Sequence, residues 1–146
     1  MERNYVRFDF EALPQNQSFA RTVASAYCGA LDPTVEELTE VKTAVSEAVS
    51  NAIIHGYQQK GCGRITMEME MIEKDKIRIR ITDYGIGISD VKKAMEPLFS
   101  TRMDQEMSGM GFTVMESFMD KLNVTSKQGE GTVVTLMKCL DLYDEN

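Results

Sequence analysis

The chain has 146 residues, of which 42% are hydrophobic and 27% are charged, and this balance predicts one globular domain over residues 1–146. A net charge of −7 without a lysine or arginine cluster argues against direct binding of nucleic acid, so proteins or small ligands are the expected partners. No run of about 18 apolar residues occurs, and the three cysteines form no CxxC pair, which argues against a membrane span and favours a reducing, cytoplasmic location.

The first part of the chain predicts one strand followed by two helices. Alternating residue types predict the strand over residues 5–11, and apolar residues at spacings of three and four predict a helix over residues 14–30. Asp32 is a suitable N-cap for the second helix, because Pro33 would then occupy the first helical position. That helix carries an apolar stripe along one side and is expected to extend to about Tyr57.

A repeated alternation in the middle of the chain predicts an antiparallel hairpin. In RITMEMEMIEKDKIRIRITD, apolar residues alternate with polar ones over residues 65–71 and again over 77–82, on either side of a turn at EKDK. The acidic residues of the first strand would lie beside the arginines of the second, which is worth roughly 0.2–1 kcal/mol per pair. One face of the hairpin is therefore expected to be polar.

The remaining elements complete an α+β fold. The sequence predicts a short helix over residues 90–95, a helix over 109–121 and two final strands over 122–127 and 132–139. Because the strands alternate in polarity, they need only one covered face. We therefore expect a two-layer α/β sandwich in which a mixed, mostly antiparallel sheet carries the helices on one face.

Polar side chains on the second helix suit a binding site. Glu47, Asn51 and His55 follow one another at spacings of four and project from one side of the helix. An amide oxygen such as that of Asn51 is a hard ligand suited to a magnesium ion, and the carboxylate of Glu47 one turn earlier could orient a nucleophile. A solvated helix face would have the same pattern, and His55 also suits a simple role at a helix end.

Two further segments are rich in glycine. In DYGIGI, Asp83 ends a predicted strand, where a buried carboxylate would need a donor such as the exocyclic amine of a base. Gly85 and Gly87 permit close approach of a ligand, although a hairpin-like turn with an exposed aspartate has the same residues. In SGMGF, Gly109 and Gly111 stand at a predicted helix start, which suits a phosphate but also a flexible N-cap.

The order of these segments resembles the ATP-binding domain of the GHKL superfamily. SEAVSNAIIHG resembles its N box, DYGIGI its G1 box, SGMGF its G2 box and GEGT the Gly-Thr element of its last hairpin. QNQSFAR, LDPTVEELTEVKTAVSEAVSNAIIHGY, PLFSTR and SGMGFTVMESFMD are similar to the anti-sigma F factors of spore-forming bacteria, which are serine kinases. The resemblance covers nearly the whole chain and implies one GHKL kinase domain of the Bergerat type.

This resemblance implies roles at both ends of a bound ATP. Asn51 would coordinate Mg²⁺, and Glu47 would act as the general base on the acceptor hydroxyl. Asp83 would bind the adenine amino group, and Thr132 would reach the adenine side through water. ATP and Mg²⁺ are therefore the expected cofactors.

The resemblance also implies an ATP lid between Phe99 and Ser108. In this lid and the glycine motifs, the further nucleotide-binding residues would be Gly85, Gly87, Thr101, Arg102, Ser108, Gly109 and Gly111. Met107 departs from the family, which has an arginine at this position. We hypothesise that Arg102 takes over the contact with the γ-phosphate; in the alternative, Met107 packs the lid and the contact is absent.

The expected partners follow from the same resemblance. The protein would hold a sporulation sigma factor inactive and phosphorylate a serine of an anti-anti-sigma factor, as a homodimer without direct contact to nucleic acid or membrane. Arg21, in the matching SFAR segment, would contact the sigma factor, although a solvated helix arginine is equally compatible. Two alternatives stay open: a non-catalytic, nucleotide-dependent binding module, and a serine kinase of the same fold that serves another stress-response sigma factor.

Overall fold

The computed structural model describes residues 3–58, 62–96 and 111–140. The strands are β1 (Tyr5–Glu11), β2 (Arg64–Glu73), β3 (Lys76–Asp83), β4 (Lys121–Lys127) and β5 (Gly131–Cys139). The helices are α1 (Gln15–Gly29), α2 (Val35–Asn51), the π-helical turn η1 (Ala52–Gly56), α3 (Val91–Ala94) and α4 (Gly111–Phe118). Among these, no helix has the length and apolar character needed to cross a bilayer.

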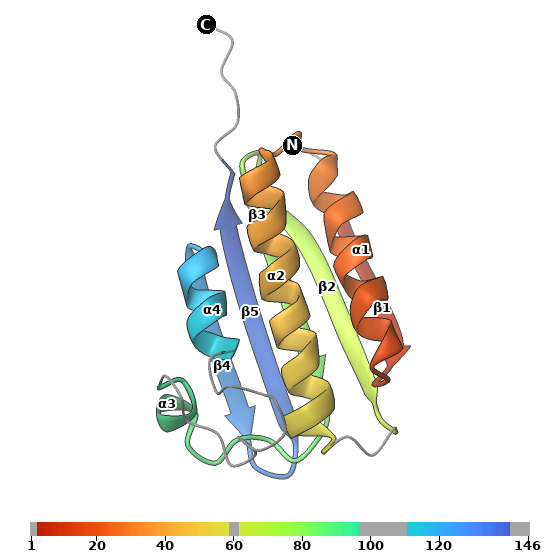
Figure 1. Cartoon of the computed structure of the whole chain (residues 1–146), viewed down its shortest axis with the longest axis vertical. Helices are drawn as coiled ribbons and strands as arrows, with labels where there is room; N and C mark the ends of the chain where they lie inside the picture. Colours follow the sequence, from red (N-terminus) through yellow and green to blue (C-terminus); the bar gives the residue numbers. More distant parts are fainter. Residues whose placement is uncertain (1–2, 59–61, 97–110, 141–146) are drawn as a thin grey trace, which may run out of the picture.

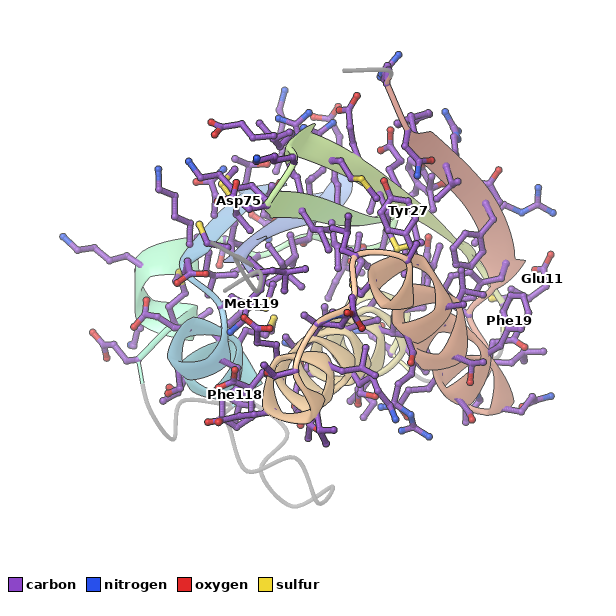
Figure 2. All side chains as sticks on the ribbon, turned by 90° about the horizontal axis from the view of Figure 1, so that it is seen from above. Glu11, Phe19, Tyr27, Asp75, Phe118 and Met119 are labelled. Carbon is purple, nitrogen blue, oxygen red and sulfur yellow. The ribbon has the colours of Figure 1, made fainter. Side chains whose placement is uncertain are left out.

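The elements form two layers, as predicted. The five strands make one sheet in the order β1-β2-β3-β5-β4, and α1, α2 and α4 lie on one face of it (Figure 1). The view from above shows the helices as one layer and the strands as the other (Figure 2). The expected α+β sandwich is therefore confirmed.

All four strand pairings of the described sheet are antiparallel, which corrects the prediction of a mixed, mostly antiparallel sheet. Two helices connect β1 to β2, so the chain re-enters the sheet in the opposite direction. The strands β3 and β4 do run parallel to each other, because each is antiparallel to β5. They are not neighbours, since β5 folds back between them.

The central hairpin has the predicted register. Glu68 lies opposite Arg80 and Glu70 opposite Arg78, and Arg78 Nη2 lies 2.8 Å from Glu70 Oε1. The other face of the hairpin lies beneath the helices and is buried except at Met71, which is partly exposed. Its side chains, together with those of α2, form the centre of the core: Ile65, Met67, Met69, Ile77, Ile79, Ile81, Val41, Val45 and Val49.

The N-cap of α2 is Thr34, so the prediction of Asp32 is wrong. Thr34 Oγ1 accepts the N–H of Glu37 at 3.0 Å, and Glu37 Oε1 accepts the N–H of Thr34 at 2.9 Å, which completes a capping box. Asp32 instead has a φ of 55° in the turn that leaves α1. Pro33 thus precedes the cap, and Val35 is the first helical residue.

The ends of two helices differ from the prediction. The helix α2 ends at Asn51 and continues as the π-helical turn η1, in which the N–H of Tyr57 donates to the carbonyl five residues earlier, that of Ala52, at 3.0 Å. The helix α4 ends at Phe118 and not at Lys121, which already belongs to β4. Lys138 Nζ fixes this end by donating to the Phe118 carbonyl at 2.6 Å.

Replacing Thr34 by alanine is expected to lower the free energy of unfolding by about 1 kcal/mol, because Oγ1, the acceptor for the N–H of Glu37 at the N-terminus of α2, is lost. Denaturant unfolding measures the change. Asp32→Gly is the matched control: it accommodates the positive φ and should change stability by less than about 0.5 kcal/mol. If Asp32→Gly lowered stability more than Thr34→Ala did, Asp32 would be the cap after all.

Candidate functional site

A cleft of about 350 Å³ opens at the end of the sheet where α2 ends and α4 begins. These two helix ends lie in the lower part of Figure 1. In the part of the chain that the structure describes, its walls are formed by the end of α2 with η1, the end of β3 with the loop that follows it and α3, the start of α4, and the hairpin of β4 and β5. Among the described residues, the polar residues and glycines that line it include Asn51, His55, Asp83, Gly87, Gly111, Gln128 and Thr132. The motifs that are separate in the sequence therefore meet in one cavity.

One end of the cleft is formed by α2 against α4. A Cβ atom built on Gly111 would lie 3.1 Å from Asn51 Oδ1 and 3.3 Å from Glu47 Oε2. Both polar side chains therefore point at the first residue of α4 and are half-buried, so they do not form a solvated helix face. Burial raises the pKa of Glu47 above its ordinary value, which makes its carboxylate a better proton acceptor.

The π-helical turn η1 connects α2 to the loop after β3. The Gly56 carbonyl accepts the N–H of Ile86 at 3.0 Å, and a Cβ atom on Gly56 would lie 2.8 Å from Asp83 Oδ1. Turns of this kind often occur at functional sites. His55 lies in the same turn and lines the cleft, which places it near the helix end as expected.

The other end of the cleft contains Asp83, which is only 6% exposed to solvent. Its Oδ1 accepts the N–H of Gly85 at 3.0 Å. Burial raises the pKa of Asp83 to about 6, although the backbone amides of Gly85 and Thr132 oppose this shift. The alternative of an exposed aspartate in a simple turn is therefore wrong.

Thr132 lies beside Asp83 because the two residues are partners in the pairing of β3 with β5. Thr132 is 7% exposed and lines the cleft. Ser126 on β4 is in turn the partner of Thr132, so the three polar residues form one row across the sheet. Of this row, Asp83 and Thr132 line the cleft and are the acceptors that could contact a base.

The two glycines of DYGIGI are also needed for contacts within the chain. A Cβ atom on Gly85 would lie 2.0 Å from the Gly56 carbonyl oxygen, and one on Gly87 would lie 2.3 Å from the Lys127 carbonyl oxygen. Gly87 also has a φ of 75° and lines the cleft. The prediction that these glycines allow close approach therefore applies first to the protein's own backbone.

Six of the residues that the sequence analysis named for the site are not placed there, for two different reasons. Thr101, Arg102, Met107, Ser108 and Gly109 lie outside the described residues. Arg21 is described but is not among the residues that line the cleft: its Nη1 donates to Ser46 Oγ at 3.3 Å, between α1 and α2.

Two residues that hold the walls of the cleft together, although they do not line it, were not predicted from the sequence. The Tyr57 hydroxyl accepts the N–H of Tyr84 at 2.7 Å and donates to the Arg64 carbonyl at 2.6 Å, which ties η1 to the loop after β3. The Ser126 hydroxyl binds the N–H of Ile88 at 2.7 Å. The sequence has no local signal for Tyr57, but the register of the last hairpin would have placed Ser126 opposite Thr132.

A sheet covered on one face, with a glycine-lined cleft between a helix end and a buried aspartate, defines a nucleotide-binding domain of the histidine kinase type. Residues 10–138 match the family model described as a histidine kinase-like ATPase domain. The anti-sigma F factor of Thermoanaerobacter sp. (strain X514) is 53% identical over 92% of this chain and 93% of its own length. That of Clostridium novyi (strain NT) is 52% identical over 96% of this chain and 97% of its own length. The chain belongs to the anti-sigma F factor family.

Solved structures support the same fold at low sequence identity. The RsbU and RsbW domains of a Mycobacterium tuberculosis protein align with a TM-score of 0.67 at 16% identity, over 94% of this chain and 32% of that one. The SiaB-SiaC complex from Pseudomonas aeruginosa aligns with a TM-score of 0.67 at 14% identity, over 90% of this chain and 88% of that one. These likenesses show the fold alone.

Replacing Asp83 by asparagine is expected to stabilise the nucleotide-free protein at pH 7 but not near pH 4. The pKa of about 6 in the folded protein lies above the ordinary 3.8, so this carboxyl group favours folding below the ordinary value and loses that contribution as the pH rises through 6. Two pKa units correspond to roughly 2–3 kcal/mol. Thermal unfolding of both proteins across this pH range measures the difference, and a pH-independent difference would contradict the buried-charge explanation.

Proposed function

We propose that this protein binds Mg-ATP in the cleft and transfers the γ-phosphoryl group to a serine of an anti-anti-sigma factor. We also propose that it holds a sporulation sigma factor inactive, as a homodimer in the cytoplasm. The observation that carries the enzymatic part is the convergence of Glu47, Asn51 and Gly111 at one end of the cleft, with Asp83 buried at the other. Membership of the anti-sigma F factor family supports the proposed partners.

The chemistry of the phosphate end fits a magnesium ion held by few protein ligands. The described residues contain no group of three or more histidine, cysteine, aspartate or glutamate side chains able to hold a metal. Magnesium bound with a nucleotide commonly uses one or two protein oxygens together with phosphate oxygens and water. The amide oxygen of Asn51 is suited to be such a ligand. The ion would supply neutralisation of the phosphate charge during transfer.

The protein's own groups would then position and deprotonate the acceptor. Glu47 would take the proton of the serine hydroxyl, a role that its raised pKa supports. The start of α4 at Gly111 would place backbone N–H groups and the positive end of the helix near the phosphates. Asp83 would accept a hydrogen bond from the adenine amino group. Of the lid residues, we retain Thr101, Arg102, Ser108 and Gly109 as proposed contacts with ATP.

The proposed surface for the sigma factor includes Arg21 on α1. Its guanidinium contacts the hydroxyls of Ser46 and Ser18, at 3.3 and 3.4 Å, and the residue is partly exposed. Ser46 directly precedes Glu47 on α2. A partner bound at Arg21 would therefore lie close to the segment that bears the proposed general base.

A phosphorylation assay tests the whole proposal. The purified chain would be incubated with Mg-ATP and candidate anti-anti-sigma factors, and phosphoserine would be located by mass spectrometry. A stable, nucleotide-dependent complex with a sigma factor, measured by size-exclusion chromatography, tests the second activity. Sigma-factor binding without any phosphoserine would favour a non-catalytic binding module, and transfer to the partner of a stress-response sigma factor would reassign the target.

Glu47→Gln is expected to keep ATP binding but to lower the single-turnover rate of phosphoryl transfer by about 10²–10⁴-fold, because the amide cannot accept the proton. Rapid-quench measurement with saturating Mg-ATP gives this rate. Glu36→Gln, on the exposed first turn of the same helix, is the matched control and should leave the rate unchanged. An intact rate in Glu47→Gln would remove Glu47 from the reaction.

Asn51→Ala is expected to abolish the magnesium-dependent part of ATP binding, because a methyl group cannot replace an oxygen ligand. Calorimetric titration of ATP with and without magnesium separates this part from the rest. Asn123→Ala, at an exposed position on β4, provides the control. If Mg-ATP bound Asn51→Ala and the unchanged protein equally well, Asn51 would not be the ligand.

A further inference from the structure

The hydroxyl group of Ser126 makes three contacts at the base end of the cleft. The N–H of Ile88 lies 2.7 Å from Ser126 Oγ, the Gly131 carbonyl oxygen lies 2.9 Å from it, and Thr132 Oγ1 lies 2.8 Å from it. Ser126 and Thr132 are partners in the pairing of β4 with β5. The three contacts thus join the loop after β3 to the last hairpin.

Counting protons determines the direction of each bond. A serine hydroxyl has one proton to donate and two lone pairs to accept with. The N–H of Ile88 can only donate and the Gly131 carbonyl can only accept, so Ser126 gives its single proton to Gly131. All three contacts are hydrogen bonds only if Thr132 donates its own proton to Ser126.

Thr132 therefore has no proton left for the cleft that it lines. Its Oγ1 offers only lone pairs to a ligand group that contacts it directly. Asp83, the partner of Thr132 on β3, is also an acceptor above its pKa of about 6. The base end of the cleft thus presents two neighbouring acceptors.

We propose that Ser126 is a positioning residue that keeps Thr132 an acceptor, so that the cleft selects a purine with an amino group at the 6-position over one with an oxo group. This inference rests on the proposed nucleotide binding and deepens it. A 6-amino group has protons to donate to both acceptors. A 6-oxo group would instead place its own lone pairs against those of Asp83 and Thr132, with no proton to form a hydrogen bond. Without Ser126, the Thr132 hydroxyl is free to rotate and to donate to the oxo group.

The test compares the dissociation constants of ATP and inosine triphosphate, measured by calorimetry with magnesium at about pH 7.5. In Ser126→Ala the ratio of the inosine to the adenosine constant is expected to fall at least about fivefold, which corresponds to one hydrogen bond near 1 kcal/mol. Loosening of the Ile88 loop would weaken both nucleotides alike and cancel in this ratio. A ratio within about twofold of that of the unchanged protein would overturn the inference.

A double-mutant comparison shows whether Ser126 acts through Thr132. In a Thr132→Val background, which has no hydroxyl to orient, Ser126→Ala should leave the ratio unchanged; a further change there would also overturn the inference. Thr125→Ala, exposed on the opposite face of β4, is the matched control. Failure of the unchanged protein to bind ATP would overturn the proposed function itself, whereas ATP binding with an unaltered ratio in Ser126→Ala would overturn only the role of Ser126.

Discussion

Burial of one carboxylate at the end of a central strand imposes the arrangement of the segments around it. The side chain of Asp83 packs against the α-carbon of Gly56 and accepts the N–H of Gly85, while its main-chain carbonyl is approached closely by Gly131. Any larger residue at these three positions would collide with Asp83 or with the backbone beside it. The cost of burying the charge appears as the raised pKa of Asp83, and an amino group bound in the cleft would offset part of that cost.

The hydrophobic core adjoins this site, since Ala48 and Ile81 belong to the core and also line the cleft. The apolar face of the hairpin β2–β3 packs on Val41, Val45 and Val49 of α2, and these side chains are completely buried. The same helix turns Glu47 and Asn51 toward α4. One amphipathic helix therefore contributes both to the core and to the phosphate end of the cleft, which fixes the polar groups on a stable element.

The helix α4 is held at both ends, which matters because it forms one wall of the cleft. Its first residue, Gly111, faces Asn51 and Glu47. Its last carbonyl, that of Phe118, accepts from the buried Lys138, which also forms an ion pair with the half-buried Glu40 of α2 at 2.9 Å. A buried cation of this kind is costly unless it is fully paired, so it specifies one position of α4 against α2 and β5.

The sequence by itself determined the features that depend on neighbouring residues. Alternation over Arg64–Glu73 and Lys76–Asp83 was sufficient for the hairpin and its charge pairs, because side chains in a strand point alternately to two faces. The resemblance located the motifs of the site but did not establish the burial of Asp83. The cap at Thr34 is local as well, because its capping box joins Thr34 to Glu37 only. The tertiary structure decided the insertion of β5 between β3 and β4 and the internal contacts of the glycines. It also decided the direction of the Ser126 hydrogen bonds, because their donors and acceptors come from segments up to 44 residues apart, from Ile88 to Thr132, that only the folded chain brings together.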